Sequence, residues 1–217
     1  MTVDVEDEVR AYRARRLLYL RNGHDREAAA RFVAGVAREL RGPTLDVGTG
    51  KGLFAIELAR RGLDVVTVDV DARERALAQR LAEEAGVASR INFDHGDGER
   101  LPYADGQFGC VAMMDVLHHL ASPRPVLLEM ARVVSANGSV IVADFDEHGF
   151  ALVERIHRAE GRTHPRTAAT VSQATDELKA AGCRLVTQGN GHQHDVVVLQ
   201  KDGAGALSPP PRCSQDP

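Results

Sequence analysis

The segment Thr44-Leu-Asp-Val-Gly-Thr-Gly-Lys-Gly-Leu-Phe54 decides the fold, because a short apolar strand runs into a glycine-rich loop and then into a helix. Glycines let such a loop turn tightly and let a ligand approach the backbone, and the N–H groups that begin the helix remain available to that ligand. A dinucleotide loop needs glycine where Leu53 stands, and a Walker loop needs Ser or Thr where Gly52 stands. The loop therefore favours a ligand without phosphates that carries an ammonium group and a carboxylate.

Outward from this loop, apolar runs of strand length alternate with segments of helical spacing. This alternation predicts right-handed β-α-β crossovers and a doubly wound α/β sheet with helices on both faces. The predicted strands are 44–47, 65–69, 90–94, 108–114 and 139–145, and the predicted helices between them are 53–61, 73–85 and 125–134.

The two ends of the chain depart from this alternation. Helical spacing covers 4–20 and 25–41, and Gly42-Pro43 ends the second helix. After predicted helices at 150–160 and 172–181, two β-runs flank Gly189-Asn-Gly191, and so short a connection predicts an antiparallel hairpin. The organisation expected is N-terminal helices covering the site over residues 1–42, a single α/β domain over 43–201 and a proline-rich disordered tail over 202–217.

Composition and charge exclude some functions. The chain has 217 residues and a formal net charge of -4, which provides no general attraction for nucleic acid or an anionic membrane. No apolar run approaches the roughly 20 residues that cross a bilayer, and the acidic N-terminus is unlike a signal peptide. Three widely spaced cysteines suggest neither zinc nor a redox motif. We expect a cytoplasmic protein, either monomer or homodimer, with no nucleic-acid partner, no membrane partner and no metal.

Three acidic residues lie at or just after the carboxyl ends of predicted strands, at positions suited to an adenosyl ligand. Asp46 precedes the first loop glycine and could face an ammonium group, or could cap the loop amides instead. Asp69 lies 21 residues after Gly48, the spacing at which an acid accepts hydrogen bonds from ribose hydroxyls. Capping of the next helix falls more naturally to Asp71. Asp97 could accept a hydrogen bond from an adenine amine.

In combination these motifs resemble the class I S-adenosylmethionine-dependent methyltransferases, in the group of small-molecule enzymes with a Leu-His-His-Leu signature. The resemblance implies a seven-stranded Rossmann-like sheet of order 3-2-1-4-5-7-6, with strand seven antiparallel. It spans about residues 44 to 146, departing from the family pattern at Gly109 and at Ala136-Asn137. The motifs are Leu45-Asp-Val-Gly-Thr-Gly-Lys-Gly52, Val68-Asp69, Gly96-Asp97 with Leu101-Pro102, Phe108 through Leu117-His-His-Leu120, and Glu129-Met-Ala-Arg132-Val-Val before Asn137-Gly138.

The resemblance also implies roles for individual residues of this chain. The glycine loop would hold the methionine part of S-adenosylmethionine, the end of the second strand its ribose and the Asp97-Gly98 loop its adenine. Met114 would line the pocket near the sulfonium. The implied cofactor-binding residues are Asp46, Gly48, Thr49, Gly50, Gly52, Asp69, Val70, Asp97, Gly98 and Met114.

Residues on the acceptor side are expected near the carboxyl ends of the fourth and fifth strands. We take His119 and Asp144 as the catalytic candidates, with Asp115 and His148 as alternatives. His192 and His194 could share a strand face and so form a metal pair, although turn or surface histidines are the commoner occurrence. A cover over the acceptor could include His157, His164, Tyr12, Tyr19 and His24.

Two other functions remain open at this stage. The chain could be a catalytically inactive S-adenosylmethionine-binding regulatory or structural subunit, or, more remotely, a nicotinamide-dependent oxidoreductase. Against a nucleic-acid substrate, the fourth strand ends in Met113-Met-Asp115-Val and lacks the Asn/Asp-Pro-Pro-aromatic motif of enzymes that methylate base amines. The methyl acceptor and the atom methylated are not specified by these residues.

Overall fold

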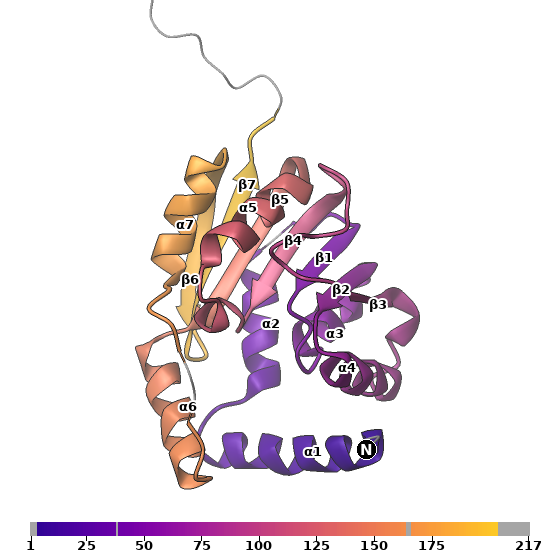
Figure 1. Ribbon diagram of the computed structural model, residues 1–217, viewed down its shortest axis with the longest axis vertical. Coiled ribbons are helices and arrows are strands. Elements are labelled where there is room, and N and C mark those ends of the chain that lie inside the picture. The colour runs from indigo at the N-terminus through magenta and orange to yellow at the C-terminus, as the bar shows by residue number, and fades with distance from the viewer. Residues whose placement is uncertain (1–3, 38, 164–165, 204–217) are drawn as a thin grey trace, which may run out of the picture.

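A computed structural model describes residues 4–37, 39–163 and 166–203, which form a three-layer α/β fold around one seven-stranded sheet (Figure 1). The sheet order is β3-β2-β1-β4-β5-β7-β6, and β7 runs antiparallel to both of its neighbours. The predicted order and strand direction are therefore confirmed. The strands are β1 (Thr44–Val47), β2 (Val65–Asp69), β3 (Ile91–His95), β4 (Phe108–Met114), β5 (Val134–Phe145), β6 (Cys183–Gly191) and β7 (His194–Lys201).

Helices cover both faces of the sheet and the carboxyl end of its parallel strands. In Figure 1, α5 and α7 lie on one face, α2, α3 and α4 lie on the other, and α1 and α6 lie beyond the strand ends. The bounds of these helices are α1 (Val5–Arg21), α2 (Arg26–Val36), α3 (Leu53–Arg60), α4 (Ala72–Glu84), α5 (Pro123–Val133), α6 (Glu147–Ala159) and α7 (Val171–Ala180); short 3-10 helices are η1 (Ala88–Arg90) and η2 (Leu117–His119). None of the described helices combines the length and apolar character needed to span a membrane.

Alternating side chains of the central strands build two hydrophobic cores. Along β4, Cys110 and Ala112 face the core beneath α1 to α4, whereas Val111 and Met113 face the core beneath α5 and α7. This two-residue alternation is the geometry of a strand, and burial on both faces explains why the strands read as continuous apolar runs. A third, small cluster joins Tyr19 of α1 to Phe145 and α6.

Three predicted boundaries are wrong. The second helix ends at Val36 rather than 41, and β5 begins at Val134 rather than at position 139. The hairpin turn is formed by His192 and Gln193, whose φ values of 51° and 60° suit a tight two-residue turn. The glycines predicted to turn belong to β6, where a Cβ on Gly191 would lie 2.9 Å from the Phe32 ring of α2.

The family departure at Gly109 has a steric reason. A Cβ on this residue would lie 2.6 Å from the Arg41 carbonyl oxygen, so no larger side chain fits where the chain enters β1. Cys110 and Cys183 are buried in the core, as expected from their apolar neighbours. Cys213, His164 and residues 204–217 of the predicted tail lie outside the described residues.

Candidate functional site

A cavity of about 500 Å³ opens at the carboxyl ends of β1, β2 and β4, the edge at which ligands bind open α/β sheets. Its lining brings together segments that follow separate strands. Most of the residues that the resemblance assigned to a cofactor meet there: Gly48, Thr49, Gly50, Asp69, Val70, Asp97, Gly98 and Met114.

The glycine loop is fixed by sterics and by the Asp69 carboxylate. Gly48 has a φ of 88°, and a Cβ there would lie 2.3 Å from a Val116 methyl group, so only glycine fits. The two Asp69 oxygens accept hydrogen bonds from the backbone N–H groups of Gly50 at 3.0 Å and Asp71 at 2.9 Å. The Asp71 side chain caps α4 by accepting from Arg73 N–H at 2.7 Å, as predicted. Asp69 remains part of the cavity wall.

Asp46 and Gly52 support the loop from behind and do not line the cavity. Asp46 lies opposite Thr67 in the parallel register of β1 and β2, and its carboxylate accepts a 2.8 Å hydrogen bond from the Thr67 hydroxyl. The same hydroxyl contacts that of Thr49 at 2.7 Å. Burial raises the pKa of Asp46 to about 7, and the Thr67 hydrogen bond opposes this shift. Gly52 begins α3 against Ala78, whose Cβ would lie 2.8 Å from an added Cβ.

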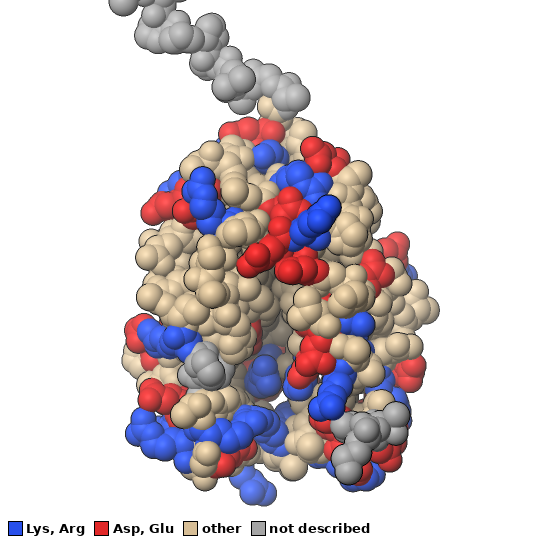
Figure 2. Space-filling model, in the orientation of Figure 1, with Lys and Arg blue, Asp and Glu red and all other residues tan. Residues whose placement is uncertain are grey.

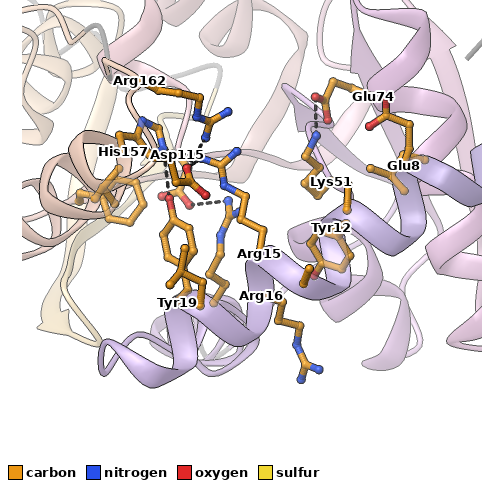
Figure 3. Close-up of a pocket in the computed structure, with 18 of the residues that line it drawn as sticks. Glu8, Tyr12, Arg15, Arg16, Tyr19, Lys51, Glu74, Asp115, His157 and Arg162 are labelled. Atoms are coloured by element: carbon orange, nitrogen blue, oxygen red, sulfur yellow. Dashed lines mark hydrogen bonds and ion pairs between the residues drawn. The ribbon is translucent and has the colours of Figure 1, made fainter.

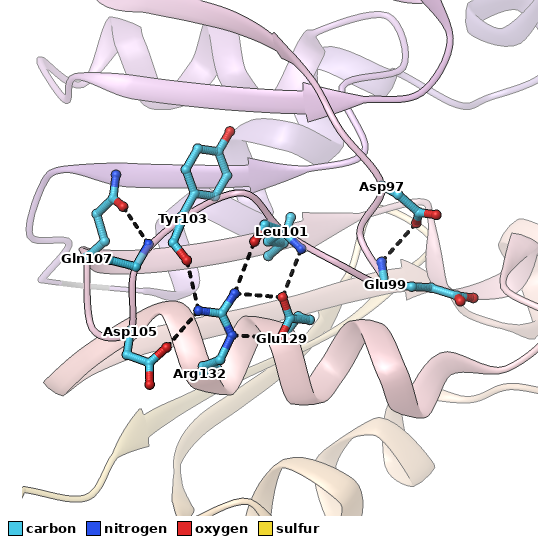
Figure 4. A network of polar contacts seen from close by, with 9 residues as sticks. Asp97, Glu99, Leu101, Tyr103, Asp105, Gln107, Glu129 and Arg132 are labelled. Carbon is cyan, nitrogen blue, oxygen red and sulfur yellow. Dashed lines mark hydrogen bonds and ion pairs between the residues drawn. The ribbon is translucent and has the colours of Figure 1, made fainter.

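An arginine network holds the loop that carries Asp97 and Gly98 (Figure 4). Arg132 of α5 donates to the carbonyl oxygens of Leu101 and Tyr103 and forms a two-point contact with Glu129, at 2.7 Å for each oxygen. Glu129 in turn accepts from the Leu101 N–H at 2.8 Å. Because this guanidinium ties two loop carbonyls to α5, the protein itself orders the loop at the Asp97 end of the cavity.

A second cavity, of about 820 Å³, lies beside the first, between α1, α6 and the strand ends (Figure 3). Its walls include Tyr12, Tyr19 and His157, three of the residues expected to cover an acceptor. Five residues line both cavities and so mark their junction: Arg26, Lys51, Glu74, Asp115 and His119. Two cavities joined at the strand ends could hold two reactants side by side.

The catalytic candidates occupy different environments. His119 lies at the junction, and burial together with the nearby His118 lowers its pKa, which favours a neutral imidazole. Asp144 lines neither cavity; it is buried and accepts hydrogen bonds from His118 Nδ1 at 2.6 Å and from the N–H groups of His118 and Phe145 at 2.8 Å. His148 is exposed on the first turn of α6 and also lines neither cavity.

Asp115 is held in an unusual backbone conformation by a buried partner. Its φ is 59°, and its carboxylate lies 2.8 Å from Nε2 of His194, an almost fully buried residue of β7. Burial alone would raise the pKa of Asp115, but the charge and hydrogen bond of His194, with Arg26, lower it to about 2. Burial would lower the pKa of His194, but Asp115 raises it. The pair is therefore held as an ion pair, so Asp115 is a poor proton acceptor.

Sequence reasoning missed Arg26, which the start of α2 places at the junction. Its guanidinium lies over the Tyr19 ring at 5.5 Å, and its closest carboxylate oxygen, on Asp115, is 4.0 Å away. The buried Nε of Arg26 has no hydrogen-bond partner among the described residues. No local motif signals this residue, because the chain around it reads as an ordinary amphipathic helix.

The two histidines considered as a metal pair do not share a strand face. His192 lies in the hairpin turn, whereas the His194 ring is buried and bonds Asp115. Within residues 4–37, 39–163 and 166–203, no group of three or more His, Cys, Asp or Glu side chains is placed to hold a metal.

Comparison with known proteins identifies the class. Residues 45–142 match the methyltransferase domain family. The ubiquinone biosynthesis O-methyltransferase of Azorhizobium caulinodans is 35% identical over 139 residues, 61% of this chain and 54% of the relative. The demethylmenaquinone methyltransferase of Deinococcus radiodurans is 33% identical over 159 residues, 69% of this chain and 61% of the relative. The chain thus spans little more than half the length of these curated relatives.

Solved structures that resemble this chain share its fold, which agrees with the sheet order described above. A crystal structure of an S-adenosylmethionine-dependent methyltransferase from Thermotoga maritima superimposes with a TM-score of 0.66 at 18% identity, covering 89% of this chain and 97% of that one. The fold is the Rossmann-like fold of these enzymes. The family match over residues 45–142 and the methyltransferase relatives together support a class I S-adenosylmethionine-dependent methyltransferase.

Proposed function

We propose that the chain binds S-adenosylmethionine in the smaller cavity and transfers its methyl group to a small molecule held in the larger one. The observation that carries this proposal is the junction, where the wall of a cavity suited to the cofactor opens into a second cavity. The curated relatives named above are a ubiquinone biosynthesis O-methyltransferase and a demethylmenaquinone methyltransferase, which supports a small acceptor.

The residues of the smaller cavity fit this cofactor. The Asp69 carboxylate ends β2 beside the loop, where ribose hydroxyls can donate to it, and Asp97 with Gly98 can meet the adenine edge. The Arg26 guanidinium lies at the junction, 4.0 Å from its closest carboxylate oxygen on Asp115, and its Nε has no hydrogen-bond partner among the described residues. We assign this guanidinium to the methionine carboxylate. We assign Asp46 an indirect role, in which it holds Thr49 through the Thr67 hydroxyl.

Since S-adenosylmethionine carries a methyl group already activated by its sulfonium, the protein mainly has to orient the acceptor and exclude water. Helix α1, with Tyr19 packed near Phe145 of β5, closes one side of the acceptor cavity. His119 is our candidate for taking the proton that an oxygen, nitrogen or sulfur acceptor loses, because its lowered pKa leaves it neutral near pH 7. Asp144 orients η2, and with it His119, through two hydrogen bonds from His118.

Activity can be tested without knowing the acceptor. We would incubate the purified protein with S-adenosylmethionine and pooled phenols, amines, thiols and carboxylic acids, and measure S-adenosylhomocysteine by mass spectrometry. We expect one pool to raise its formation together with a methylated product. Cofactor binding with no acceptor-dependent turnover in any pool would instead support the inactive binding subunit.

A further inference from the structure

The larger cavity carries positive charge on a part of its wall that does not line the smaller cavity. Arg15 of α1 and Arg162, just beyond α6, both donate to the same oxygen of Glu160, at 3.0 and 2.9 Å. Figure 3 shows Arg15 and Arg162 on the same side of the cavity as His157, Tyr19 and Asp115, while Lys51, Glu74 and Glu8 lie on the other side. The Asp115 carboxylate is already paired with His194. Two guanidiniums thus share the Glu160 carboxylate.

Neighbouring groups do not cancel this excess charge. Arg16 lines the cavity but points away from the cluster in Figure 3, and it pairs with Glu27 on α2. Burial and the charge of Arg15 lower the pKa of His157, which favours a neutral imidazole that neither adds to the positive charge nor balances it. Its Nε2 lies 2.8 Å from an Arg15 Nη. In Figure 2, Lys and Arg side chains gather at the lower end of the hollowed face, over α1 and α6. This local excess exists within a chain of net charge -4.

The walls between the arginines and the junction are apolar and aromatic. Tyr19, Phe145 and Val153 form a packed cluster on this side of the cavity, and each is less than a tenth exposed. A rigid apolar wall with one charged end is the lining that binds an amphiphilic small molecule in a defined orientation. The His119 ring at the junction would then face the end of that molecule opposite to the charge.

We propose that the methyl acceptor is a small carboxylate with an apolar or aromatic body, bound with its carboxylate against Arg15 and Arg162 and its body along Tyr19 and Phe145. This inference rests on the proposed function, since it names the substrate class of that same site. Guanidinium groups bind carboxylates through paired, charge-assisted hydrogen bonds. A single negative charge matches the single positive charge that Glu160 leaves unbalanced.

The test compares matched probes on the full chain saturated with S-adenosylhomocysteine. Calorimetric titrations with 3-phenylpropanoate, its amide and phenyl phosphate would measure the preference for each head group. We expect the carboxylate to bind at least about tenfold more tightly than the amide, the effect of one charge-assisted contact. Equal binding of carboxylate and amide, or binding of phenyl phosphate alone, would overturn the proposal.

Variants separate anion recognition from a structural role. R15Q and R162Q should each reduce the carboxylate preference severalfold, whereas E160Q should increase it by removing the competing anion. R158Q is the matched control, because Arg158 lies on α6 outside the cavity and pairs with Glu154. A purely structural cluster would give no increase in E160Q, and that result would contradict the proposal.

Affinity for S-adenosylhomocysteine serves as the folding control for every variant. If the wild-type chain binds S-adenosylhomocysteine but shows no carboxylate preference, the substrate class is wrong and the proposed function stands. If it does not bind S-adenosylhomocysteine, the proposed function itself has failed.

Discussion

The two cavities are built in opposite ways. The smaller one is formed by loops that each follow their own strand, so Gly48, Asp69 and Asp97 lie close to the motif that positions them. The larger one is formed by groups distant in the chain: Arg15 meets Glu160 across 145 positions, and Asp115 meets His194 across 79. Local sequence patterns therefore determine the proposed cofactor cavity, whereas contacts between residues distant in the chain determine the proposed acceptor cavity.

This contrast explains what could be predicted from the sequence. The alternation of strands and helices and the Asp71 cap could be predicted because strand periodicity, helix spacing and capping chemistry are local. The sheet order was implied by the family resemblance, since no local pattern specifies which strands are neighbours. Asp144 attracted a catalytic interpretation because it ends β5, yet its burial against His118 depends on tertiary packing that no spacing reveals. Arg26 and Arg162 were missed for the same reason.

The largest effect expected at the junction is on turnover. His119→Ala should reduce turnover by on the order of 10²–10⁴-fold for an acceptor that must lose a proton, with little change in cofactor affinity. Steady-state kinetics and calorimetry would measure both quantities. His148→Ala is the control, since that exposed side chain lines neither cavity. Normal turnover in His119→Ala would limit the histidine to a structural role.

Asp144→Ala should destabilise the fold rather than act only on chemistry. The change removes the acceptor of three buried hydrogen bonds and should lower the free energy of unfolding by about 3–5 kcal/mol. Thermal or urea unfolding would measure the loss, and Asp144→Asn should lose less because its amide oxygen still accepts. A stable but inactive Asp144→Ala protein would contradict this structural role and support a catalytic role for Asp144.

Asp69→Ala tests the locally encoded cavity. Loss of charge-assisted hydrogen bonds to ribose should weaken S-adenosylhomocysteine binding by about 1–3 kcal/mol. Asp71→Ala is the matched control: it should cost about 1 kcal/mol of stability through the lost cap and leave affinity unchanged. Unchanged affinity in Asp69→Ala would remove this carboxylate from the site.

The Asp115–His194 pair predicts a pH window of stability. Because the pKa of Asp115 is lowered to about 2, its ionised carboxylate stabilises the fold fully at pH values above its ordinary pKa of 3.8. This stabilisation is lost as the pH falls towards 2. Because the pKa of His194 is raised, its protonated ring stabilises the fold fully at pH values below its ordinary pKa of 6.5. This stabilisation is lost as the pH rises through the raised pKa. The pair should therefore contribute most between those two ordinary values.

Asp115→Asn tests this window, because asparagine tolerates the positive φ of this position. Thermal unfolding across the pH range should show the variant less stable by about 1–2 kcal/mol within the window, with convergence towards wild type on both sides. A pH-independent difference would show that the two residues do not form an ion pair.

The smallest effect is expected at Asp46. Asparagine can still accept the Thr67 hydrogen bond, so Asp46→Asn should weaken S-adenosylhomocysteine binding by less than about 1 kcal/mol. Calorimetry would compare the variant with Asp69→Ala. A loss as large as that of Asp69→Ala would indicate that Asp46 meets the ammonium group directly.

The most direct measurement for the central claim is calorimetric titration of the wild-type chain with S-adenosylmethionine, S-adenosylhomocysteine and NADH. We expect both adenosyl compounds to bind with dissociation constants on the order of micromolar and NADH not to bind. Binding of NADH alone, or of none of the three, would contradict it.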